Sequence, residues 1–184
     1  TLFPYTTLFR LSEERRCRER VYELVEGRVY FYYGTSNGLK TESDWVAEGD
    51  QASANFGISL AGVGDIYNDG YADILIGAHE YDGAGNAFGY YGSADGLNTI
   101  ADWTAEGNQL GASFGLTLDT AGDVNGDGYD DILIGSPYFD NGEANSGRVF
   151  VYHGSASGLS LSNSWEAGGS QANAIFGQSI GTAG

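Results

Sequence analysis

The sequence has a single cysteine, two prolines and no methionine among its 184 residues. One cysteine, Cys17, excludes an internal disulfide framework, so packing, hydrogen bonds or bound ions must hold the fold together. No run of residues approaches the roughly 18 consecutive apolar side chains that predict a membrane-spanning helix. The chain therefore shows no pattern of membrane insertion.

Positive charge is also scarce. Eight Lys and Arg residues stand against 25 Asp and Glu, giving a formal net charge of −17. Such a surface repels phosphate backbones, which argues against a nucleic-acid partner. It suits metal cations, although an acidic coat that keeps the protein soluble is the alternative interpretation.

The first twenty residues differ from the remainder. Residues 1–10 resemble the in-frame translation of a common sequencing adapter, and residues 11–20 are a charged stretch with no later counterpart. We therefore predict that residues 1–20 are a non-native or disordered leader without function. A genuine short amphipathic leader is the alternative.

Thirty glycines and thirteen tyrosines indicate many short strands joined by tight turns. An eight-residue segment that begins and ends with glycine occurs three times, followed each time by Gly-Leu, a tryptophan and Phe-Gly. The copies are residues 27–34, 85–92 and 147–154, with Trp45, Trp103 and Trp165, and Phe56, Phe114 and Phe176. The second copy of every landmark lies 58 residues after the first, and the third lies 62 residues after the second. This constant register defines repeat units at 27–84, 85–146 and 147–184.

Each unit predicts four strands. In the best-defined unit these begin at Phe114, at residues 132–135, at residues 147–152 and near Trp165. Four antiparallel strands in roughly 60 residues are typical of a β-propeller blade. We predict an all-β fold over residues 21–184, with about two and a half to three blades that form an open array. The repeated tryptophans and phenylalanines are expected to pack in its core.

Between the first and second strands of this unit lies an acidic loop at residues 123–131, Asp-Val-Asn-Gly-Asp-Gly-Tyr-Asp-Asp. Calcium takes six to eight oxygen ligands, and alternate positions of a tightly turned loop converge on one point. The candidate ligands are Asp123, Asn125, Asp127, the carbonyl of Tyr129, and Asp131. Gly128 permits the turn, and Asp130 is expected to point away from the ion.

A second loop, at residues 65–73, offers Asp65, Asp69, the carbonyl of Tyr71, and Asp73. Its third position is Tyr67, which supplies neither a carboxylate nor an amide oxygen, so we expect a weaker site. An EF-hand is excluded, because the twelfth positions are Ile76 and Ile134 rather than glutamate. The predicted affinity is weak, with a dissociation constant of about 10⁻⁴–10⁻³ M. Plain turns with solvated acids are the alternative for both loops.

These motifs resemble the FG-GAP repeat, the blade unit of integrin α-subunit propellers and of many bacterial exported proteins. The resemblance lies in the Phe-Gly pairs, in the acidic loop, and in residues 77–79 and 135–137 (Gly-Ala-His and Gly-Ser-Pro), which stand where the family has Gly-Ala-Pro. It implies Ca²⁺ in the loops, ligand binding across one face of a seven-bladed ring, and an extracellular or cell-surface location. We expect the chain to be a fragment of such a ring.

No motif predicts catalysis. The sequence lacks a nucleophile elbow, a phosphate loop and a cysteine nucleophile pattern. Glu48 and Glu106 occupy matching positions, but the third copy has Gly168 there, so a paired-carboxylate hydrolase is not supported. We expect a non-enzymatic calcium-binding scaffold for protein or glycan interaction, such as adhesion, with the remaining blades of the same propeller as partners. The alternatives are an accessory propeller of a larger secreted hydrolase or phospholipase, and a purely structural array.

Overall fold

The computed structural model describes residues 8–11, 27–35 and 38–182. Within these ranges the chain forms β-strands and one short 3-10 helix, η1. The elements are β1 (Leu8–Leu11), β2 (Arg28–Tyr32), β3 (Gly34–Thr35), β4 (Gly38–Leu39), β5 (Trp45–Glu48), β6 (Ser59–Gly62), β7 (Ile74–Ala78), η1 (Tyr81–Gly83), β8 (Asn86–Tyr90), β9 (Trp103–Glu106), β10 (Thr117–Gly122), β11 (Asp131–Ser136), β12 (Arg148–Tyr152) and β13 (Trp165–Gly168).

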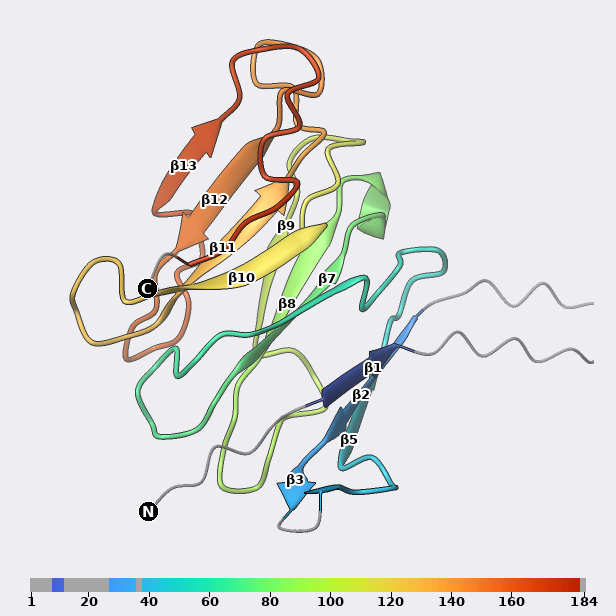
Figure 1. The fold of residues 1–184 in the computed structure, drawn as a ribbon, viewed down its shortest axis with the longest axis vertical. Coiled ribbons are helices and arrows are strands. Elements are labelled where there is room, and N and C mark those ends of the chain that lie inside the picture. Colours follow the sequence, from blue (N-terminus) through green and yellow to red (C-terminus); the bar gives the residue numbers. More distant parts are fainter. Residues whose placement is uncertain (1–7, 12–26, 36–37, 183–184) are drawn as a thin grey trace, which may run out of the picture.

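The strands form antiparallel sheets in simple chain order. Two sheets have four strands each, β6-β7-β8-β9 and β10-β11-β12-β13, a third is β1-β2-β5, and β3 and β4 form a small hairpin. Figure 1 shows the three larger sheets following one another through the molecule, and the described part of the chain does not close them into a ring. The predicted all-β architecture of open, partial propeller blades is confirmed.

The four predicted strands of the best-defined unit are present, but the first begins later than expected. It starts at Thr117 rather than at Phe114, because Ser113 and Gly115 have φ values of 55° and 80° and turn the chain before the sheet. From there the register runs across the sheet, pairing Leu118 with Ile134. Each strand of this blade therefore pairs with the strand that precedes or follows it in the chain.

The core lies between neighbouring sheets. The apolar runs of β7 and β11 supply fully buried side chains, among them Leu75, Ile132 and Ile134. The ring of Phe114 packs edge-on against Phe150 at a centroid distance of 5.4 Å. Each such buried side chain contributes roughly 1.5–3 kcal/mol to stability. Because one cluster contains residues of both four-stranded sheets, neither sheet buries its apolar face alone.

A close backbone contact recurs wherever one sheet meets the next. A Cβ atom added to Gly85 would lie 2.1 Å from the carbonyl oxygen of Phe114, inside van der Waals contact. Gly27 stands in the same relation to Phe56, and Gly147 to Phe176, both at 2.2 Å. All three glycines have positive φ values. The glycine that opens each repeat and the phenylalanine of Phe-Gly are thus two halves of one junction.

Tryptophan and phenylalanine burial differs in the third copy. Trp45 and Trp103 are 8% and 5% exposed, and their indole N–H groups donate to the carbonyls of Asn98 and Ser160 in the following unit. Trp165 is 55% exposed, and Phe176 is 43% exposed. The prediction of core packing is therefore wrong for this copy, because in the earlier copies the cover comes from the next unit along the chain.

Strand β1 occupies the place beside β2 that the second strand fills in a complete blade. It pairs antiparallel with β2, from Leu8 opposite Tyr32 to Leu11 opposite Val29. The other residues of the predicted leader, 1–7 and 12–20, lie outside the described residues. The proposed division between a leader at 1–20 and a propeller region at 21–184 stays a prediction. In the described ranges, no helix has the length and apolar character needed to span a bilayer.

The Gly85–Phe114 contact predicts a position-specific cost for one methyl group. Gly85→Ala combines a backbone clash with left-handed strain and should destabilise the chain by about 3 kcal/mol or more. Gly142→Ala is the matched control, because its φ is 89° but nothing lies within 4 Å of the added Cβ; its cost should be about 1 kcal/mol. Urea unfolding followed by circular dichroism measures both, and equal losses would contradict the junction.

Candidate metal-binding loops

The two acidic loops occupy equivalent places in consecutive blades. The first acidic loop (residues 65–73) leads from β6 to β7, and the second acidic loop (residues 123–131) leads from β10 to β11. Each therefore joins the first two strands of its blade. In each loop the ninth position is buried, whereas the fifth is exposed to solvent.

In the second acidic loop, Asp123 organises the turn. Its carboxylate accepts the backbone N–H groups of Gly126, Asp127 and Gly128 at 2.7, 3.0 and 2.8 Å. The N–H of Gly128, followed by those of Gly126 and Asp127, lowers the pKa of this carboxyl. Asp123 is thus held ionised at an exposed loop, as a cation ligand must be.

The third and fifth positions of this loop lie together. The side chain of Asn125 donates to the Asp127 carboxylate at 2.9 Å and accepts the Asp127 backbone N–H at 2.9 Å. Asp127 in turn accepts the N–H of Tyr129 at 3.1 Å. Three of the predicted ligands, Asp123, Asn125 and Asp127, therefore share one hydrogen-bonded turn.

Asp131, the ninth position, behaves differently from the other ligands. It is fully buried, and its two carboxylate oxygens accept the backbone N–H groups of Val124 at 3.0 Å and Gly154 at 2.9 Å. It therefore ties the loop both to itself and to the segment after β12. Because each oxygen can accept more than one contact, these bonds leave capacity for a cation.

The first acidic loop repeats this plan. Asp65 accepts the N–H groups of Asp69 and Gly70 at 2.9 and 2.7 Å. Buried Asp73 accepts those of Ile66 and Gly92 at 2.8 and 2.7 Å. Burial raises the pKa of Asp73 to about 6, and the charges of Asp65 and Asp69 add to this increase. Residues 65–73 contain no Lys, Arg or His, so no basic side chain within the loop balances these carboxylates.

Tyr67 breaks the pattern in the first loop. Its ring packs against Tyr91 at a centroid distance of 5.1 Å, and its hydroxyl donates to the carbonyl of Gly92 at 3.3 Å. Burial, with the neighbouring Asp69 second, raises its pKa to about 12, so the phenol stays protonated. The loop consequently lacks the oxygen ligand that Asn125 supplies in the second loop.

The donor chemistry fits a hard cation best in the second loop. Its candidate set consists entirely of oxygen ligands, namely three carboxylates, one amide and one backbone carbonyl. Over the described ranges, however, no three or more His, Cys, Asp and Glu side chains are gathered as a metal-binding group. The carboxylates are turned instead toward backbone N–H groups within and beside the loops.

Three contributors to this region were missed at the sequence level. The glycines Gly92 and Gly154 donate their N–H groups to Asp73 and Asp131; their signal was the invariant last glycine of each repeated segment. The other is Asp130, which was expected only to point away from the ion. Its carboxylate accepts the backbone N–H of Asp65 at 2.8 Å, in the neighbouring blade.

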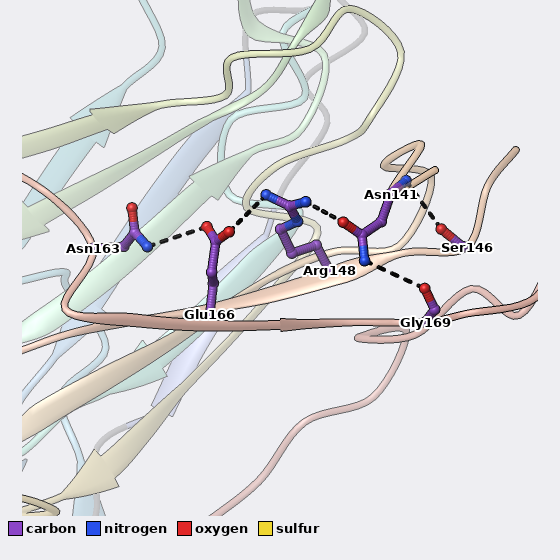
Figure 2. Close-up of polar contacts among 6 residues, drawn as sticks. All are labelled: Asn141, Ser146, Arg148, Asn163, Glu166 and Gly169. Carbon is purple, nitrogen blue, oxygen red and sulfur yellow. Dashed lines mark hydrogen bonds and ion pairs between the residues drawn. The ribbon is translucent and has the colours of Figure 1, made fainter. Parts of the chain in front are cut away.

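A separate polar cluster surrounds Arg148, the first residue of β12 in the sheet β10-β11-β12-β13 (Figure 2). Its guanidinium donates to Glu166 at 2.9 Å and to the side-chain oxygen of Asn141, and lies 4.2 Å from the ring centroid of Phe139. Asn163 donates to the second oxygen of Glu166 at 3.2 Å. With its charge paired and its donors engaged, this cluster clamps β13 to β12 rather than forming a reactive site. Glu48 is similarly paired, with Arg28 at 2.5 Å.

Comparison with known proteins agrees with this geometry. Residues 114–152 match the family model of the FG-GAP repeat, which covers the Phe-Gly turn, the second acidic loop and the glycine-bounded third strand. These residues are therefore an FG-GAP repeat, and the chain is similar to integrin α chains over a longer stretch. Its relatives include human integrin alpha-6, 36% identical over 62% of this chain and 10% of that protein, and rat integrin alpha-7, 46% identical over 62% and 10%. Integrin alpha-5 of Xenopus laevis is 29% identical over 96% of this chain and 18% of its own length.

The chain spans less than a fifth of the length of these relatives. The predicted recognition of an integrin-like FG-GAP propeller is confirmed. The likeness concerns the blade region.

The different settings of Asp131 and Asp127 predict different structural costs without any metal. In the presence of a chelator, Asp131→Ala leaves two backbone N–H groups unpaired in a buried setting and should cost about 3 kcal/mol or more. Asp131→Asn keeps one acceptor oxygen and should cost about half as much. Asp127→Ala, in an exposed turn, should cost below about 1 kcal/mol. Chemical denaturation ranks the three variants, and similar losses for positions 127 and 131 would contradict the burial argument.

Proposed function

We propose that this FG-GAP region is a non-enzymatic, calcium-stabilised propeller scaffold that presents loops for protein or glycan recognition at the cell surface. The observation that carries the proposal is the second acidic loop. It combines an oxygen-only donor set with the FG-GAP match over the same residues. The integrin α chains among the relatives support a role in recognition rather than catalysis.

In the second acidic loop, Asp123, Asn125, Asp127, the carbonyl of Tyr129, and Asp131 would hold Ca²⁺. Bound calcium would supply a divalent charge that neutralises the crowded carboxylates and fixes the loop. The first loop, with Asp65, Asp69, Tyr71 and Asp73, would bind more weakly because Tyr67 is committed to Gly92. The role proposed for the ion is structural: it would stiffen the loop that joins the first and second strands of the blade.

Calcium should raise the melting temperature of the chain. With about 10 mM calcium and a dissociation constant of about 10⁻⁴–10⁻³ M, mass action gives about 1.4–2.7 kcal/mol of stabilisation, or about 3–10 °C. Asp127→Ala should remove most of the shift, whereas Asp69→Ala should remove little of it. Thermal melts with calcium and with chelator measure this, and Asp95→Ala controls for the loss of an exposed carboxylate. A melting temperature that calcium leaves unchanged would refute the metal site.

The proposed location is tested on cells. An antibody raised against residues 59–168, the two complete blades, should stain intact source cells expressing the natural protein. Staining that appears only after permeabilisation would contradict presentation at the surface. Soluble protein and glycan arrays probed with the purified chain, with and without calcium, would then identify the class of ligand.

A further inference from the structure

The two acidic loops are not independent of one another. We propose that Asp130 is a positioning residue that couples them, so that order imposed at the second acidic loop is transmitted to the first. The transmission of cation binding rests on the calcium proposal above, whereas the positioning role of Asp130 does not. Neither is given by the repeat pattern, in which Asp130 occupies the non-ligating eighth position.

The contacts run from one loop to the other at three points. The carboxylate of Asp130 accepts the backbone N–H of Asp65 at 2.8 Å, and the backbone N–H of Asp130 approaches the carbonyl of Asp65 at 3.5 Å. The side chain of Asn68 donates to the carbonyl of Gly128 at 3.3 Å. The first residue of the first loop is therefore held from both sides of its peptide backbone by a residue of the second.

The space for this contact depends on glycines. A Cβ atom on Gly64 would lie 1.9 Å from a carboxylate oxygen of Asp130, so only glycine admits the side chain there. A Cβ atom on Gly154 would lie 2.3 Å from the carbonyl oxygen of Asp130 and 2.5 Å from that of Ile66. Both loops and the end of β12 thus meet without intervening side chains.

The two acidic loops differ in burial and in the residue at their eighth position. Asp65 is half-buried, whereas the equivalent Asp123 of the second loop is exposed. The first loop has Ala72 at the position of Asp130, so it carries no carboxylate with which to grip a preceding loop. Of the two loops, only the second therefore reaches back to the loop before it.

Position in the chain makes the contact a coupling device. Asp130 immediately precedes Asp131, the buried ninth position of the second loop, and Asp65 is the first candidate ligand of the other. Restraining Asp131 also restrains its neighbour Asp130, which holds the backbone of Asp65. The side chain of Asp65 in turn accepts the N–H groups of Asp69 and Gly70. This support suits a first loop that lacks the third-position ligand.

Hydrogen exchange measured by mass spectrometry on the intact chain tests the positioning role directly. In chelator, Asp130→Ala should speed exchange in peptides covering Asp65 by about tenfold, because a charge-assisted hydrogen bond to that N–H is lost. Asp130→Asn, which keeps an acceptor oxygen, should restore most of the protection. Asp95→Ala should leave it unchanged. Wild-type exchange at Asp65 in Asp130→Ala would overturn the positioning role.

Adding about 10 mM calcium then tests transmission. In the wild-type chain both loops should become protected, and in Asp130→Ala the second loop should gain protection while the first gains several-fold less. Equal protection of the first loop in both proteins would overturn the coupling while leaving the calcium proposal intact. If calcium protects neither loop of the wild-type chain, the calcium proposal and transmission are both refuted. The chelator experiment still decides the role of Asp130.

Discussion

The arrangement of this molecule depends on one contact between backbones, repeated where each sheet meets the next. Gly27, Gly85 and Gly147 lie so close to the carbonyls of Phe56, Phe114 and Phe176 that no side chain fits between them. This approach brings one sheet down onto the next and buries the phenylalanine ring in the first two copies. Because the two four-stranded sheets share one core cluster, the junction between them contributes to the stability of both.

Around the Gly85 and Gly147 junctions an equivalent side-chain contact recurs. The hydroxyl of Ser59 donates to the carbonyl of Gly115 at 2.6 Å, and that of Thr117 donates to Gly177 at 2.7 Å. Tyr91 accepts the N–H of Leu159 at 2.9 Å across the same seam. Repetition of such bonds fixes how far one blade turns against its neighbour, and this places consecutive acidic loops within hydrogen-bonding distance of each other.

The acidic loops therefore take part both in their own blade and in the contact between neighbouring blades. Within a blade, each loop wraps its own backbone N–H groups around the first and fifth aspartates. Between blades, Asp130 links the second loop to the first. A cation at such a place would act on two units at once, which agrees with a stabilising role for the ion in a repeat protein.

Much of this was predictable from sequence, because the signals are local and repeated. The four-strand unit, the two nine-residue loops and the defect at Tyr67 follow from spacing and residue type, and the structure shows the phenol turned to Gly92. The start of β10 was placed three residues early, since the positive φ of Ser113 has no residue-type signal as strong as that of glycine. Trp165 and Phe176 were assigned to a core because their sequence context matches that of Trp103 and Phe114, although burial depends on what covers a side chain.

The sequence by itself determined the fold class, the blade unit and the chemistry of the loops, since alternation, turn residues and ligand spacing act over a few residues. Only the tertiary structure decided which aromatic rings are buried, which backbone N–H groups occupy the loop carboxylates, and what Asp130 contacts. Asp65 and Asp130 belong to different repeats, and no local pattern relates them. Their meeting follows from the packing of one whole sheet on the next through the glycine–phenylalanine junctions, and this packing is a property of the tertiary structure.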